Sequence, residues 1–145
     1  MRKRILFSVL VVTMLIATGC RKYPDGPTIS FIPKVDRISQ NWIVDQIYRN
    51  DIEETDQYDV YGMNITKGGR LTWTIDFRDI DPITIAGDWE LASVKEQIKF
   101  TFDEKDPVSG ETRLLYMDIL RLTQDQLWLN FLTDGDYYLV RLRPA

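Results

Sequence analysis

Strict alternation of apolar and polar residues runs through much of the chain after residue 40, and it limits the fold more than any other feature. In residues 70–78 every second side chain is apolar, so that one face carries Leu71, Trp73, Ile75 and Phe77. The same period recurs in residues 83–91 and 98–102. A period of two is typical of a half-buried β-strand, whereas an amphipathic helix has a period of about 3.6 residues. The pattern therefore predicts an all-β fold.

Short turn signals separate the alternating runs. Gly68 and Gly69 lie between two runs, Pro82 ends another because it has no N–H for a central ladder, and Asp134-Gly135 is a strong two-residue hairpin signal. We expect a short helical turn at residues 35–40 and strands at residues 41–49, 58–66, 70–78, 83–92, 95–102, 112–122, 126–133 and 137–143. Eight consecutive strands favour an up-and-down antiparallel β-barrel, which has no open sheet edge. A two-sheet sandwich is the alternative, since alternation alone does not separate the two folds.

The first 20 residues have the three parts of an export signal. Basic residues 2–4 precede an apolar run at residues 5–16, and small residues then lead to Cys20. The apolar run is shorter than the roughly 20 residues of a membrane-spanning helix. Residues 17–20, Ala-Thr-Gly-Cys, resemble a bacterial lipobox, which implies cleavage before Cys20 and acyl chains on this cysteine. The alternative is an ordinary cleaved signal that leaves Cys20 as a free thiol.

The expected organisation is a signal peptide at residues 1–19, a lipidated cysteine with a flexible tether at residues 20–34, and a barrel domain at residues 35–145. Two or three acyl chains would hold the protein on a membrane, because each buried CH₂ contributes about 0.8 kcal/mol. Prolines in the tether favour extended backbone over a packed element. Acidic residues after the cysteine accompany surface export in Bacteroidetes-type lipoproteins, and here basic residues follow Cys20. We therefore expect a periplasm-facing position on the outer membrane.

Composition argues against several classes of function. The chain has no histidine and one cysteine, so it lacks the usual ligands of zinc, haem and iron–sulfur sites and the residues of a Ser-His-Asp or Cys-His catalytic set. Removal of the signal takes away three basic residues and leaves 15 Lys and Arg against 22 Asp and Glu, a net charge of −7. This acidity argues against nucleic acid as a partner, because phosphate binding needs clustered Lys and Arg. We expect no cofactor, no metal and no enzymatic activity.

Four segments of the chain resemble the lipocalin-like lipoproteins that are common in Bacteroidetes: residues 38–45, 67–73, 85–91 and 118–129. The resemblance covers residues 37–143 and implies a small barrel without an established enzymatic activity. It also implies that an arginine of the last strand, Arg141 or Arg143, packs over Trp42 in a structural cation–π contact. It does not supply a ligand.

Aromatic residues on the apolar strand faces are candidates for lining a ligand cavity: Trp42, Trp73, Trp89 and Phe100. Lipocalin interiors hold small apolar ligands in this way. The alternative is that these side chains fill the core, since an eight-stranded barrel is just wide enough for side chains to fill it.

Trp128 alternates out of phase with its apolar neighbours, so we expect it to face outward together with Asn130 and Leu132. An outward Trp and Leu form a candidate patch for a protein or sugar partner. A single exposed aromatic residue without a function is the alternative.

Acidic residues offer two further candidates. Asp88 and Glu90 share a strand face at a spacing of roughly 7 Å, and paired carboxylates can hydrolyse glycosides. A solvated strand face is the simpler interpretation, because no other catalytic group is expected beside them. The acidic stretches at residues 51–59 and 103–106 lack the Asp-x-Asp-x-Asp-Gly loop of a calcium site, so we interpret them as solvated surface.

Two functions are compatible with these features of the sequence. The first is a non-catalytic outer-membrane lipoprotein whose barrel binds another envelope protein or a glycan. The second is a carrier of a small hydrophobic ligand in the barrel interior. A cavity large enough for a ligand would favour the carrier, whereas a filled interior with an exposed apolar patch around Trp128 would favour the binding module.

Overall fold

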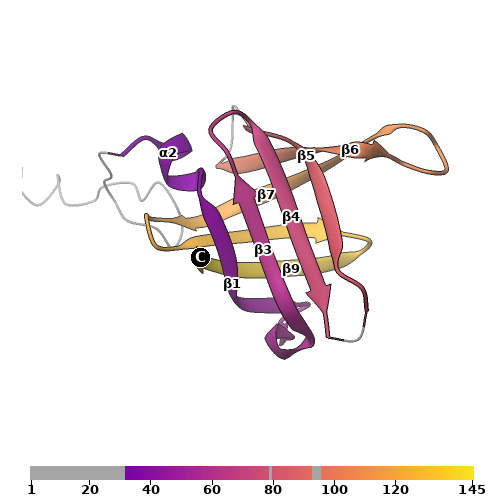
Figure 1. Cartoon of the computed structure of the whole chain (residues 1–145), viewed down its shortest axis with the longest axis horizontal. Helices are drawn as coiled ribbons and strands as arrows, with labels where there is room; N and C mark the ends of the chain where they lie inside the picture. The colour runs from indigo at the N-terminus through magenta and orange to yellow at the C-terminus, as the bar shows by residue number, and fades with distance from the viewer. Residues whose placement is uncertain (1–31, 79, 93–95) are drawn as a thin grey trace, which may run out of the picture.

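The computed structural model describes residues 32–78, 80–92 and 96–145 (Figure 1). The predicted export signal, Cys20 and most of the tether lie outside these residues. The elements are α2 (Lys34–Ile38), β1 (Asn41–Arg49), β2 (Ile52–Glu53), the 3-10 helix η1 (Thr55–Gln57), β3 (Tyr58–Ile65), β4 (Arg70–Phe77), β5 (Ile83–Leu91), β6 (Gln97–Lys105), β7 (Thr112–Leu122), β8 (Leu127–Thr133) and β9 (Asp136–Pro144).

The strands form a closed antiparallel barrel. Strand β1 pairs with β3, each strand from β3 to β8 pairs with the next one, and β9 pairs back to β1 from Tyr138 to Pro144. The predicted eight-stranded up-and-down barrel is thus confirmed, and the two-sheet sandwich is wrong. The short strand β2 folds back onto the end of β1 as a small extra hairpin. No helix among the described residues is long and apolar enough to cross a membrane.

The strands agree with the prediction to within one or two residues, except for the end of β6 and the unpredicted strand β2. The sequence predicts that β6 ends at residue 102, but the ladder between β6 and β7 continues to Lys105 and Thr112 after a register shift. Figure 1 shows these two strands extending beyond the barrel as a hairpin. Residues 103–105 are exposed, so this part of β6 has no buried face and shows no apolar alternation. The strand β2 was missed for the same reason, because both of its residues are exposed.

The predicted hairpin at Asp134-Gly135 is present. Asp134 has φ 51° and Gly135 has φ 86°, and the flanking residues Thr133 and Asp136 pair across the turn. Positive φ at both central residues is the requirement of a type I′ turn, which suits the right-handed twist of paired strands.

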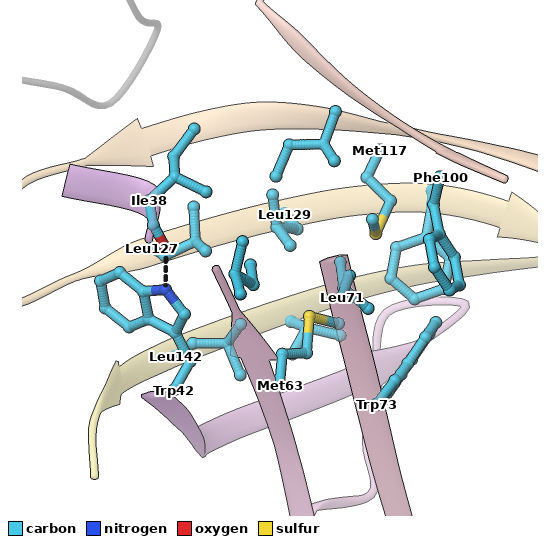
Figure 2. Packing of buried hydrophobic residues seen from close by; sticks show 14 of the residues in the cluster. Ile38, Trp42, Met63, Leu71, Trp73, Phe100, Met117, Leu127, Leu129 and Leu142 are labelled. Carbon is cyan, nitrogen blue, oxygen red and sulfur yellow. Dashed lines mark hydrogen bonds between the residues drawn. The ribbon is translucent and has the colours of Figure 1, made fainter. Parts of the chain in front are cut away.

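The interior is filled by side chains at the end of the barrel that α2 covers, which we call the closed end. Trp42 is 1% exposed, and its Nε1–H donates a hydrogen bond of 2.8 Å to the carbonyl of Ile38 in α2. Figure 2 shows this bond beside Leu127 and Leu142, which belong to the same buried cluster. The buried Arg37 also fixes α2, because its guanidinium donates a 2.7 Å hydrogen bond to the carbonyl of Leu122. The helix therefore closes this end.

Candidate functional site

The candidate site is a cavity of about 180 Å³ at the opposite end of the barrel, which we call the open end. Its walls are largely aromatic and comprise Tyr58, Trp73, Phe77, Phe102, Phe131 and Tyr138. An apolar cavity of roughly 150 Å³ can bind benzene, whereas drug-sized ligands occupy about 300–1,000 Å³. The cavity is therefore suited to a single ring or a small branched apolar group.

The aromatic walls are held by contacts among the rings themselves. Trp73 lies edge-on to Phe131, with ring centroids 5.6 Å apart, and Phe131 stacks on Tyr138 at 5.4 Å. Tyr58 lies 4.9 Å from Phe77 on another part of the wall. Edge-to-face and stacked pairs at these distances stabilise aromatic clusters beyond simple burial. The cavity surface is thus supported by packed rings of strands β3, β4, β8 and β9.

The phenol groups near the cavity are neutral at physiological pH. Burial raises the pKa of Tyr58 and Tyr138 above the usual value of a phenol, and the neighbouring phenol raises the pKa of Tyr58 further. Burial raises the pKa of Tyr61 well above that value. Titration of these groups lies at alkaline pH, so they add polarity to the wall without adding charge near pH 7.

An ion pair fixes the rim beside these tyrosines. Glu54 is 8% exposed and accepts hydrogen bonds of 2.6 and 3.0 Å from the guanidinium of Arg49. Asp136 lies 3.6 Å from the same guanidinium. A nearly buried carboxylate needs such a partner, because an unpaired buried charge is costly. The charged groups on this side of the rim therefore pair with one another and have a structural role.

Arg113 and Asp134 lie on the other side of the rim, where both line the cavity. The guanidinium of Arg113 lies over the ring of Phe102, at 4.7 Å from the ring centroid. Within the described residues neither side chain has a salt bridge. This side of the rim can therefore offer both a cationic and an anionic group to a ligand.

Trp73 presents its ring to the cavity and keeps its polar atom in the wall. Its Nε1–H is buried and has no hydrogen-bond partner within the described residues. The nearby indole of Trp73 lowers the pKa of the Tyr61 hydroxyl slightly, whereas burial raises this pKa by more. The indole N–H and the hydroxyl do not reach hydrogen-bond geometry. Because the N–H is shielded, a ligand would meet Trp73 through apolar contact.

Only one of the four aromatic residues predicted to line a ligand space does so in this cavity, namely Trp73. Trp42, Trp89 and Phe100 are buried in the same hydrophobic cluster as Trp73 but do not line this cavity. The indole N–H groups of Trp42 and Trp89 are engaged by the carbonyls of Ile38 and Thr66, both at 2.8 Å. All four side chains point into the barrel, so alternation does not distinguish them. Their depth along the barrel decides which of them lines the cavity.

The predicted contact of Arg141 or Arg143 with Trp42 is wrong. Arg141 alternates with the buried Val140 and Leu142, so it faces outward, and Arg143 is exposed. The guanidinium of Arg141 lies over the ring of Trp128 at 4.5 Å instead. The indole N–H of Trp42 donates instead to the carbonyl of Ile38 in α2, which precedes the first strand.

Trp128 faces outward with Asn130 and Leu132, as its position in the alternation predicts. Its ring does not lie open to solvent, because the guanidinium of Arg141 lies over it. A second guanidinium, that of Arg121, lies 5.3 Å from its ring centroid. The more exposed apolar groups on this side are Leu132 at 65% and Tyr116 and Leu114 at 48% each. The apolar surface is therefore displaced from Trp128 toward strand β7.

The acidic candidates form ion pairs or lie at the surface. Asp88 pairs with Arg70 at 2.9 Å, and Glu90 pairs with Lys99 at 2.7 Å. Each carboxylate of the candidate catalytic pair is thus bound to a base on a neighbouring strand. Among the described residues no group of three or more His, Cys, Asp or Glu side chains could hold a metal ion.

A closed meander of eight strands around an apolar interior defines a lipocalin-like barrel. No protein-family profile matches the chain, and no curated protein matches its sequence. Its fold is similar to the crystal structure of a lipocalin-like protein from Bacteroides uniformis ATCC 8492, with a TM-score of 0.53 and 16% sequence identity. The similarity covers 75% of this chain and 99% of the other. At this identity the comparison shows the fold, and no ligand is carried over.

Proposed function

We propose that this protein is a non-catalytic binding protein of the bacterial cell envelope that holds a single-ring apolar or aromatic group at the open end of its barrel. The observation that supports this function best is the aromatic cavity of about 180 Å³. At the closed end Trp42 and its neighbours form a packed cluster. The second function derived from the sequence, a carrier of a small hydrophobic ligand, thus receives more support than the first.

The proposed envelope location rests on the lipobox-like sequence before Cys20 and is compatible with the arrangement of the domain. The described chain begins beside α2 at the closed end, and Ala145 at the C-terminus donates a 3.0 Å backbone hydrogen bond to Asn41 at that end. A lipid anchor joined through the tether would leave the cavity free on the opposite end. We propose the periplasmic face of the outer membrane as the site of attachment.

Cys20→Ala tests the anchor. We expect the variant to move from the membrane fraction to the soluble fraction of fractionated cells, because it loses the acyl chains that each contribute about 0.8 kcal/mol per buried CH₂. Retention of the variant in membranes at the wild-type level would refute lipidation. This result would leave the cavity proposal unaffected, since ligand binding is measured separately from membrane attachment.

Ile85→Phe tests the cavity. Ile85 lines the cavity from β5, and the larger side chain should fill space that a ring would occupy. We expect toluene to shift the methyl NMR signals of Leu115 in the wild-type protein, and we expect Ile85→Phe to weaken this binding at least about tenfold, or 1.4 kcal/mol. The matched control is Thr84→Phe, which places the same side chain on the other face of β5 and should leave toluene binding unchanged.

Absence of toluene binding by the wild-type protein would contradict the proposed cavity function. The first function derived from the sequence, a module that binds an envelope protein or glycan, would then become the leading one. It is favoured by the exposed surface formed by Leu114, Tyr116 and Leu132, which shares Leu132 with the predicted patch of Trp128, Asn130 and Leu132.

A further inference from the structure

The barrel wall is incomplete between β7 and β8 at the open end. The ladder between these strands runs from Leu122 and Leu127 to Asp118 and Asn130, and it ends there. Strand β7 continues to Thr112 and pairs only with β6 in this part, while β8 continues to Thr133 and pairs only with β9. Two strand edges therefore face each other without a ladder, and we call the space between them the seam.

The seam lies beside the cavity. A more open groove of about 310 Å³ lies between the two strands. Five of its lining residues also line the cavity, namely Phe102, Arg113, Leu115, Thr133 and Asp134. The groove and the cavity therefore adjoin at these five residues, on the side of the barrel.

The outer border of the seam carries three apolar side chains, and the charged Arg113 and Asp134 also line its groove. Leu114 and Tyr116 on β7 and Leu132 on β8 are each about half exposed or more, at 48%, 48% and 65%. Outward strand positions are usually polar when they only face water. Apolar side chains beside an apolar cavity suit a ligand that leaves water before it enters the barrel.

The register of the two strands would allow the seam to close. The last pair is Asp118 and Asn130, so continuation of the same register would oppose Tyr116 to Leu132 and Leu115 to Thr133. The phase is correct for both pairs, because Tyr116 and Leu132 both face outward, while Leu115 and Thr133 both line the cavity. Extension of the ladder would therefore place no charged side chain in the core and would pair free backbone groups, which favours closure.

We propose that the ligand of the open-end cavity enters and leaves through the seam between β7 and β8, and that the seam closes over the ligand by extension of the ladder. This inference rests on the proposed function, since it assigns a route to the same cavity. The ligand class it fits is a compact apolar ring, because the cavity of about 180 Å³ is too small for a long chain. The end of the barrel is not the main route in this mechanism.

A reversible lock tests this route. In a Cys20→Ser background, Tyr116→Cys and Leu132→Cys form a disulfide across the closed seam, because directly opposed residues of an antiparallel pair have Cα atoms about 4.5–5.5 Å apart. The matched control is Asp118→Cys with Asn130→Cys, which crosslinks the same two strands at a pair that the ladder already contains. Toluene uptake and release are measured by NMR exchange with each disulfide oxidised and then reduced.

We expect the seam disulfide to slow toluene uptake at least about tenfold, which corresponds to a barrier higher by about 1.4 kcal/mol. Reduction should restore the wild-type rate, and the control disulfide should leave the rate unchanged. Toluene loaded before oxidation should also be released more slowly, which separates a blocked route from a loss of cavity volume.

Three results would overturn the inference. Wild-type exchange rates in the oxidised seam variant would show that the ligand uses the end of the barrel. Failure of the seam disulfide to form under conditions that oxidise the control would show that the ladder does not extend. Failure of the wild-type protein to bind toluene would overturn the proposed function and this route with it, whereas the first two results leave toluene binding intact.

Discussion

Gly87→Ala is expected to destabilise the barrel by more than about 3 kcal/mol, because the added methyl group has no space. A Cβ atom at this position would lie 2.1 Å from the carbonyl oxygen of Thr101 and 2.6 Å from Cε2 of Phe100. Real Cβ contacts essentially never fall below 3.0 Å, so the backbones of β5 and β6 would have to separate. Equilibrium urea denaturation gives the loss in the free energy of unfolding.

Gly68→Ala is the matched control for this prediction. The nearest atom to its added Cβ would be Oγ1 of Thr66 at 3.8 Å, which is an ordinary van der Waals distance. We expect this variant to unfold within about 0.5 kcal/mol of the wild-type protein, as most surface substitutions do. If Gly87→Ala were as stable as Gly68→Ala, the close approach of β5 to β6 would be contradicted.

Trp42→Ala is expected to cost about 3–5 kcal/mol, the usual range for removal of a buried tryptophan. The side chain is 1% exposed and lies within the packed cluster of the closed end. Trp42→Phe separates packing from hydrogen bonding, because it keeps a ring but removes the N–H that reaches Ile38. We expect about 1 kcal/mol for this smaller change, the usual net contribution of one hydrogen bond, because the Ile38 carbonyl still accepts a 2.9 Å hydrogen bond from the backbone N–H of Gln40.

Trp128→Ala is the matched control for Trp42→Ala, because it removes a tryptophan from the surface of the barrel. Trp128 lies on the outer face between the guanidinium groups of Arg121 and Arg141, and cation–π contacts at exposed sites contribute about 0.5–1 kcal/mol each. The free energy of unfolding should therefore fall by less than about 2 kcal/mol. Equal losses for Trp42→Ala and Trp128→Ala would contradict the assignment of Trp42 to the core and Trp128 to the surface.

The strands could be predicted because each is half-buried. Alternation in residues 70–78 predicts β4 nearly to the residue, since burial on one face imposes the period directly. The predicted turn at Asp134-Gly135 depends only on local backbone conformation, and it is present. The outer part of β6 and all of β2 could not be found in this way, because no face of these segments is buried.

The site was harder to predict, because inward phase does not tell how deep a side chain lies along the barrel. Trp42 and Trp73 have the same phase, yet Trp42 fills the closed end and Trp73 lines the cavity. The role of Arg37 could not be predicted from strand patterns, because α2 precedes the strands. Its hydrogen bond to the carbonyl of Leu122 joins residues that are far apart in the sequence.

The amino-acid sequence by itself determined that this chain forms consecutive antiparallel strands with local turns, because alternation and turn chemistry act between neighbouring residues. It also determined which side chains face inward, since a strand places successive residues on opposite faces. The tertiary structure alone decided that the barrel closes through β1 and β9, that α2 covers one end, and that β7 and β8 separate at the other. These features depend on contacts between distant segments and on the relative tilt of whole strands, and a local pattern carries no information about either.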